Sequence, residues 1–194
     1  MRAERSRETK QRIYDIAMDL FEEKGYDQVK VTDICEAADV SVGSFYHYYR
    51  SKEYILLACS SVLDEYFKKL APTAREKTAS ESLRKLIHCK LHFYTDLGIE
   101  ICQKLAVASV NFKEGSSLDI GRSTYQYIER VVEDGIAKGE FRADVDPRQV
   151  TSILRYQLGG LVLRWCFEDG SFDLTLETDV MLSSFLQLLT QPKR

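Results

Sequence analysis

The stretch that decides the fold is VTDICEAADVSVGSFYHYYRSKEYILLA, residues 31–58. Its spacing predicts two short helices, the first capped by Thr32 and the second by Ser41, because small oxygen-bearing side chains accept the free N–H groups at a helix start. A turn at Asp39 joins them, and aspartate tolerates the left-handed backbone of such a turn better than most residues do. These are the proportions of a helix-turn-helix.

The second of these helices has two different faces. Phe45 and Tyr49, four residues apart, are expected to anchor it to a small core. The opposite face has no charge, and its tyrosine and histidine tips can reach phosphates or base edges. That face consists of Val42, Gly43, Ser44, Tyr46, His47 and Tyr48. The alternative is that a short tyrosine-rich helix is ordinary core or surface, which is the commoner case when such a helix is taken alone.

Positive charge is concentrated at the N-terminus, although the whole chain has a net charge of −3. Residues 1–12 contain five arginine and lysine residues against two glutamates, a balance of +3. Lys52 is expected in the first turn of the next helix, where the helix dipole disfavours a cation unless a phosphate is bound. This distribution of positive charge favours a DNA-binding protein. The alternative for residues 1–12, the basic arm, is a solvated tail without a binding role.

With these features the stretch resembles the DNA-binding signature of the TetR family of transcriptional regulators. The matching residues are Thr32, Ile34, the Ala37-x-x-Val40-Ser41 corner, Gly43, Phe45-Tyr46, Tyr49 and Ser51-Lys52-Glu53. The chain departs from the family pattern at Asp39, where glycine is usual, and at Tyr49, where phenylalanine is commoner.

The resemblance implies specific roles for the residues of this stretch. Thr32, Tyr46 and Lys52 are expected to bind DNA phosphates. The residues expected to face the major groove are Val42, Gly43, Ser44, His47 and Tyr48. The resemblance also implies a palindromic double-stranded operator, a homodimer, and a C-terminal domain that binds a small-molecule effector.

The rest of the chain predicts an all-α protein, since it has only three prolines and ten glycines. We expect an N-terminal helix-turn-helix domain with its basic arm at 1–52, a linking helix at 53–71 that Ser51 caps, and a C-terminal helical ligand-binding and dimerisation domain at 72–194. Further helical patterns lie at about 81–97, 100–113, 119–138, 147–168 and 174–190.

Two late helices are the candidates for a dimer interface. The residues expected there are Leu158, Gly159, Leu161, Val162, Phe185, Leu188 and Leu189. The pair Gly159-Gly160 is costly in the middle of a helix unless a neighbour approaches closely. An ordinary core within one chain is the alternative.

The ligand pocket is less well specified. Aromatic side chains can line it, although most aromatic residues in such a domain belong to the core. The candidates are Phe93, Tyr94, Phe112, Tyr125, Tyr127, Tyr156 and Trp165. Arg155 interrupts an apolar helix and can pair with an anionic ligand, although an ion-paired or solvent-facing arginine is commoner.

Several function classes are disfavoured. We find no GxSxG, P-loop or GxGxxG motif, so we expect neither an enzyme nor a cofactor. His88, His92 and Asp96 share a helical face, but without an HExxH pattern we expect no metal site. Five scattered cysteines favour reduced thiols. Because no long apolar run and no secretory signal occur, we expect a cytoplasmic protein without a membrane partner.

The sequence therefore predicts a ligand-responsive regulator, a repressor that a small-molecule effector releases from its operator. The alternatives are a DNA-binding regulator without a ligand and a transcriptional activator.

Overall fold

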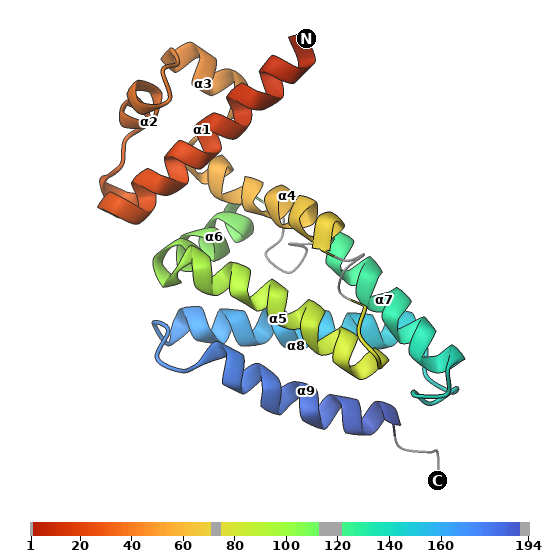
Figure 1. Ribbon diagram of the computed structural model, residues 1–194. Helices are drawn as coiled ribbons and strands as arrows, with labels where there is room; N and C mark the ends of the chain where they lie inside the picture. Colours follow the sequence, from red (N-terminus) through yellow and green to blue (C-terminus); the bar gives the residue numbers. More distant parts are fainter. Residues whose placement is uncertain (1, 71–74, 113–121, 191–194) are drawn as a thin grey trace. The chain divides into compact units, whose positions relative to one another are not determined.

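The computed structural model describes residues 2–70, 75–112 and 122–190, and over these ranges it contains helices and no strand (Figure 1). The predicted all-α fold is confirmed. The helices in chain order are α1 (Arg2–Lys24), the short 3-10 helix η1 (Tyr26–Gln28), α2 (Val31–Ala37), α3 (Val42–Tyr48), α4 (Lys52–Leu70), α5 (Ala79–Leu97), α6 (Ile99–Phe112), α7 (Arg122–Ala137), α8 (Pro147–Phe167) and α9 (Leu174–Thr190).

The chain forms two compact units whose boundaries do not follow the sequence in a simple way. The first unit contains residues 1–59 and 100–115, and the second contains residues 60–99 and 116–194. The boundary therefore falls inside α4, and α6 groups with the N-terminal helices although it follows α5 in the sequence.

The first unit is a helical domain with its own core. Helix α1 packs on η1 and on α2, and α2 packs on α3. Ile13 and Ala17 of α1 are fully buried, as are Ile34 of α2 and Phe45 of α3. The predicted basic arm is not a separate tail, because its residues form the first turns of α1 from Arg2 onward.

The described part of the second unit consists of the later turns of α4 and of the long helices α5, α7, α8 and α9. Helix α7 packs on α5 and α8, and α9 packs on the same two helices (Figure 1). Leucine, isoleucine and valine side chains fill the interior, as expected from the 3.6-residue period of these segments. Fully buried examples are Leu83, Ile87, Ile128, Val132, Leu154 and Leu182.

The start of α5 is held by two acidic side chains. Thr78 and Glu81 form a capping box, in which each side chain accepts the other's backbone N–H group. The carboxylate of Glu140 accepts N–H bonds from Ala79 at 2.6 Å and from Ser80 at 2.9 Å. The free N–H groups of this helix terminus are therefore already bound to oxygens of the chain itself.

Two of the predicted helix caps are wrong. Helix α2 begins at Val31, so Thr32 lies within its first turn, and the carboxylate of Asp33 reaches back to the N–H of Lys30. The Ser51 hydroxyl donates to the Glu53 carboxylate instead of accepting an N–H from α4. In both places a nearby carboxylate, a strong acceptor, accepts a hydrogen bond from a residue just before the helix.

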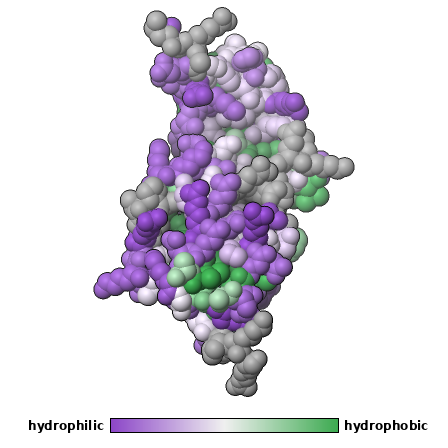
Figure 2. All heavy atoms as spheres, turned by 90° about the vertical axis from the view of Figure 1, so that its right-hand side faces the viewer, coloured by the Kyte–Doolittle hydropathy of each residue, from purple (hydrophilic) through white to green (hydrophobic). Residues whose placement is uncertain are grey.

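The surface of the chain is mainly polar on the face that Figure 2 shows, with an apolar patch in its lower half and further apolar atoms at the right-hand edge. Within the described ranges, no helix is both long and apolar enough to span a lipid bilayer.

Candidate nucleic-acid interface

The turn between α2 and α3 has the geometry that its sequence predicts. Asp39 adopts a left-handed backbone with φ of 49°. The N–H of Val40 then bonds back to the carbonyl of Cys35 at 3.0 Å, which closes the end of α2. Aspartate fills the position without glycine because its short polar side chain tolerates this region.

Helix α3 is capped and anchored as predicted. The Ser41 hydroxyl accepts the N–H of Ser44 at 3.0 Å. Phe45 is fully buried, and Tyr49, 4% exposed, donates its hydroxyl hydrogen to the carbonyl of Lys10 at 3.2 Å. These contacts fix the rotation of α3 about its axis and decide which side chains face outward.

The outward face of α3 carries the residues expected to read DNA. Tyr46 is 53% exposed and Val42 is 44% exposed, and Gly43 and His47 are also exposed. Ser44 and Tyr48, the other two expected major-groove residues, are half-buried on the same helix. Thr32 is exposed in the first turn of α2.

Gly43 leaves the start of α3 open. A Cβ at this position would lie 3.9 Å from the Ser41 hydroxyl, with no closer neighbour among the described residues. The chain's own packing therefore does not require glycine here. A requirement for glycine would have to come from a molecule that approaches α3 from outside.

Lys52 has contacts within the chain that the sequence did not predict. Its ammonium donates to the carbonyl oxygens of Tyr26 at 2.7 Å and Val29 at 2.9 Å, and it lies 4.1 Å from the centre of the Tyr26 ring. These two bonds use two of the three N–H donors of the ammonium group. Lys52 thus ties α4 to the loop before α2, and these two bonds leave one of its three donors unused.

Helix α6 contacts the same loop from another side. The N–H of Tyr26 donates to a carboxylate oxygen of Glu100 at 2.9 Å. The Lys104 ammonium bonds both carboxylate oxygens of Asp27, at 2.8 and 2.6 Å. The hydrogen bond from Lys104 holds the pKa of Asp27 below its ordinary value. Because these partners are more than seventy residues apart, no local sequence signal indicated them.

The aromatic residues proposed for a ligand pocket are mostly core. Tyr94, Tyr125 and Trp165 are at most 9% exposed, Phe93 and Tyr127 are half-buried, and Tyr156 is 59% exposed on α8. The Phe112 side chain lies outside the described residues. Among the six candidates whose side chains the structure describes, burial therefore ranges from core positions to an exposed one.

Two cationic side chains, one of them buried, lie beside Tyr125. Lys90 is only 3% exposed, and its ammonium donates to the Tyr125 hydroxyl at 2.7 Å. The guanidinium of Arg155 lies 6.0 Å from the same ring and 5.3 Å from the ring of Tyr156. The interior of the second unit is thus polar around Tyr125.

The residues expected at a dimer interface fall into two groups. Leu158, Phe185 and Leu189 are at most 9% exposed, so the chain's own core takes up their surface and leaves little for a partner. Leu188 is 64% exposed. Gly159, Leu161 and Val162 are half-buried. The assignment of these residues to a dimer interface stays a prediction.

An exposed apolar surface does run along α8 and α9. Its large side chains are Ile153, Tyr156, Phe167, Leu176, Val180 and Leu188, each at least 46% exposed. Gly160 lies on the outer side of α8, and a Cβ there would meet no described atom within 4 Å. We refer to these seven residues as the α8/α9 face.

His88, His92 and the five cysteines have the surroundings of ordinary structural or surface residues. His88 contacts Asp179 of α9 through its Nε2 atom at 2.9 Å, and His92 is exposed. In the part of the chain that the structure describes, no three histidine, cysteine or acidic residues form a metal-binding group. All five cysteines are free thiols, and burial raises the pKa of Cys59 to about 11.

Two protein-family models match the chain. Residues 13–59 match the model of bacterial regulatory proteins of the tetR family. Residues 76–191 match the C-terminal region of MAATS-type transcriptional repressors. The first match covers the helix-turn-helix, and the second covers the described helices of the second unit from α5 onward.

Individual relatives align over nearly the whole chain. The fatty acid metabolism regulator protein of Bacillus subtilis is 24% identical, and the alignment covers 91% of each chain. The crystal structure of Thermus thermophilus FadR, a transcriptional repressor in complex with lauroyl-CoA, is 25% identical with a TM-score of 0.66 and covers 92% of each chain. Bacillus subtilis FadR in complex with stearoyl-CoA is 23% identical with a TM-score of 0.56 and covers 93% of this chain and 97% of that one.

Proposed function

This chain belongs to the TetR family of bacterial regulatory proteins, and from that premise we propose that it represses transcription and leaves its operator when a small-molecule effector binds. The family and the relatives are transcriptional regulators, so the chain is a regulator and not an enzyme. The observation that carries the proposal is the outward face of α3, whose side chains are held away from the core by buried Phe45 and Tyr49.

Helix α3 is the proposed recognition helix. The hydroxyl of Tyr46 and the imidazole of His47 reach phosphate oxygens or base edges, and Gly43 lets the helix backbone come close to the strand. Val42, Ser44 and Tyr48 face the major groove, and Thr32 binds a phosphate from the start of α2. Lys52 adds a phosphate contact through its third N–H donor.

The active form is a homodimer that reads a palindrome. Two copies joined through the α8/α9 face bury the large apolar side chains that one chain leaves exposed. Gly160 supports this arrangement, because a glycine in the middle of a helix is costly and no described atom lies within 4 Å of the place that its Cβ would take. Two recognition helices about 34–36 Å apart then enter successive major grooves on one side of the duplex.

The effector we propose is an acyl-coenzyme A thioester. Support comes from the two FadR structures with lauroyl-CoA and stearoyl-CoA bound and from the fatty acid metabolism regulator of Bacillus subtilis. A thioester that binds one arrangement of the dimer better than another shifts the population away from the DNA-binding form by its difference in affinity.

The test is selection of genomic DNA fragments by the purified chain, followed by binding to the recovered site at two salt concentrations. We expect a palindrome, a steep loss of affinity with salt, and a large loss on Tyr46→Ala. The matched control is Tyr66→Ala, since Tyr66 is a comparably exposed tyrosine, 47% against 53%, outside the helix-turn-helix.

Failure to enrich any sequence would contradict DNA binding. Addition of lauroyl-CoA then tests the effector, and we expect release of the DNA. If the site lies upstream of a promoter and transcription from it rises when the chain is deleted, the chain is a repressor; a fall on deletion would make it an activator.

A further inference from the structure

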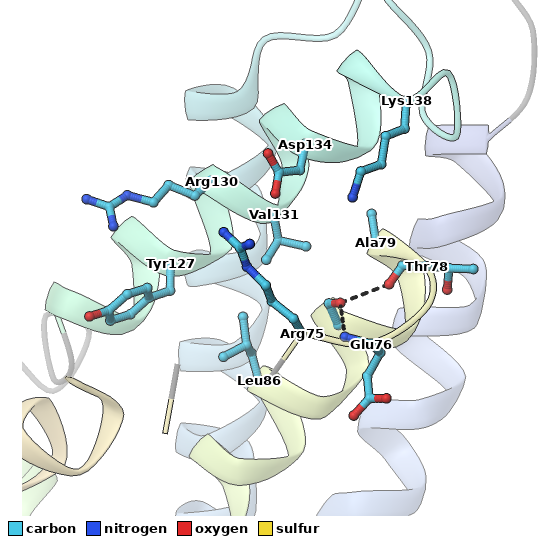
Figure 3. A pocket seen from close by; sticks show the side chains of 11 residues that line it. Arg75, Glu76, Thr78, Ala79, Leu86, Tyr127, Arg130, Val131, Asp134 and Lys138 are labelled. Atoms are coloured by element: carbon cyan, nitrogen blue, oxygen red, sulfur yellow. Dashed lines mark hydrogen bonds between the residues drawn. The ribbon is translucent and has the colours of Figure 1, made fainter. Parts of the chain in front are cut away.

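Helices α5 and α7 enclose a groove that none of the candidate residues except Tyr127 had indicated. Its volume is about 550 Å³, within the usual range of small-molecule sites. Its lining comes from the segment that leads into α5, from the first two turns of α5 and from one side of α7 (Figure 3). Every lining residue belongs to the second unit.

The groove is bordered by three cations. Arg75 reaches from the α5 side toward α7, and Lys138, directly after the end of α7, points toward Ala79 (Figure 3). Arg130 lies further along α7. All three side chains are exposed, and the positive charge of Lys138 helps to lower the pKa of the nearby Glu140 carboxyl. The groove therefore offers guanidinium and ammonium groups to an incoming anion.

The acidic residues of the lining do not cancel this charge. Glu76 points away from the groove and pairs with Lys85 at 2.5 Å (Figure 3). Asp134 is the one other acid of the lining, and a single carboxylate among cations suits the hydroxyl groups of a sugar. The start of α5 attracts no further anion, because Glu140 already accepts its N–H groups.

One end of the groove is aromatic. Tyr127 is half-buried there, and the guanidinium of Arg130 lies 5.7 Å from the centre of its ring. An aromatic ring beside a guanidinium plane is a surface on which a flat base stacks. The side chains of Leu86 and Val131 supply an apolar floor between this end and the cationic end.

From this combination we infer that the α5/α7 groove binds the nucleotide end of a ligand, with an aromatic base on Tyr127 and Arg130 and phosphate groups on Arg75 and Lys138. The inference rests on the proposed acyl-coenzyme A effector, whose charged end is an adenosine carrying phosphates. It names the residues that hold that end, and none of them belongs to the helix-turn-helix.

The direct test is calorimetric titration of the full chain with adenosine 3′,5′-bisphosphate, without DNA. We expect saturable binding that falls about tenfold in Arg75→Gln and in Arg130→Gln, because each change removes a charge-assisted hydrogen bond. Adenosine, which lacks the phosphates, is expected to bind at least about tenfold more weakly for the same reason. Arg148→Gln is the matched control, since Arg148 is an exposed arginine of α8 outside the groove.

Three results would overturn the assignment: no binding of the bisphosphate at millimolar concentration, equal binding by wild type and both arginine variants, or equal binding of inorganic phosphate alone.

A separate measurement, the release of DNA by lauroyl-CoA, distinguishes this inference from the proposed function. If lauroyl-CoA releases DNA equally from wild type and from Arg75→Gln, the effector response stands and the groove assignment fails. If the bisphosphate binds as expected but lauroyl-CoA releases no DNA, the groove stands and the proposed effector fails.

Discussion

The ring of Phe141 occupies the space in which a side chain on Gly135 would lie. A Cβ at Gly135 would come within 2.3 Å of the Phe141 Cδ2 atom and within 2.8 Å of the Ala79 Cβ atom. The carbonyl of Gly135 also accepts the N–H groups of Glu140 and Phe141, at 2.9 and 3.1 Å. The close approach of α7, α5 and the segment after α7 therefore depends on this glycine.

Replacement of Gly135 by alanine should destabilise the second unit. The clash with a buried ring outweighs the gain in helix propensity, and we expect a loss of about 1–3 kcal/mol in the free energy of unfolding. Urea unfolding followed by circular dichroism measures it. In the background of Phe141→Ala the same substitution should cost markedly less, and an unchanged cost would show that the Phe141 ring is not the cause.

Glu140→Gln should reduce stability at neutral pH and lose its effect in acid. Partial burial alone would raise the pKa of Glu140, but hydrogen bonds from the Ser80 hydroxyl and from the N–H groups of Ser80 and Ala79 hold it below its ordinary value. Because the folded-state pKa is depressed, the contribution is present above the unfolded-state pKa of about 4.3 and is lost as the pH falls through the folded-state pKa.

The measurement for Glu140 is the difference in unfolding free energy between wild type and variant at pH 7, 5 and 3.5. We expect the difference to shrink only at the lowest pH. Glu133→Gln, at an exposed position of α7, is the matched control for the loss of a glutamate charge from this region. A difference that stayed constant down to pH 3.5 would contradict the role given to the Glu140 charge.

Lys52→Met separates a structural role from a phosphate contact. Because Lys52 donates to Tyr26 and Val29 within the chain, we expect a loss of roughly 1–3 kcal/mol in stability without any DNA. If the third donor also binds a phosphate, the salt dependence of operator binding should fall by about one unit of slope. An unchanged melting temperature would disprove the structural role.

Val180→Glu should convert the dimer to a monomer. Val180 is 60% exposed on the α8/α9 face, and a carboxylate buried there against a second copy would lack a partner. Light scattering after size-exclusion chromatography gives the mass. Val110→Glu is the control, since Val110 is 78% exposed on α6; dissociation by Val110→Glu alone would place the interface elsewhere.

Local sequence signals predicted the helix-turn-helix well. The left-handed Asp39, the Ser41 cap and the buried Phe45 depend on neighbours within a few residues, and each was found as expected. The cap at Thr32 was misplaced by a local feature too, because α2 begins at Val31 and the Asp33 carboxylate accepts the N–H of Lys30.

Contacts between segments far apart in the chain could not be predicted from the sequence. The lysine at position 52 was identified, but its bonds to Tyr26 and Val29 depend on a loop that approaches from elsewhere in the fold. The α5/α7 groove combines residues around 75–86 with residues 127–138, and no periodicity relates two such segments. For α8 and α9, the hydrophobic pattern showed that both helices pack on something but not which side faces the chain's own core.

The attachment of α6 to the N-terminal unit has a consequence for synthesis on the ribosome. Helices α1 to α3 and the start of α4 are translated first, but the bonds from Glu100 and Lys104 to the Tyr26 segment form only after residue 104 has left the exit tunnel. At a translation rate of roughly 5–20 residues per second, these bonds form several seconds after the helix-turn-helix has been synthesised. A fragment that stops at the end of α4 keeps the recognition helix but lacks these bonds.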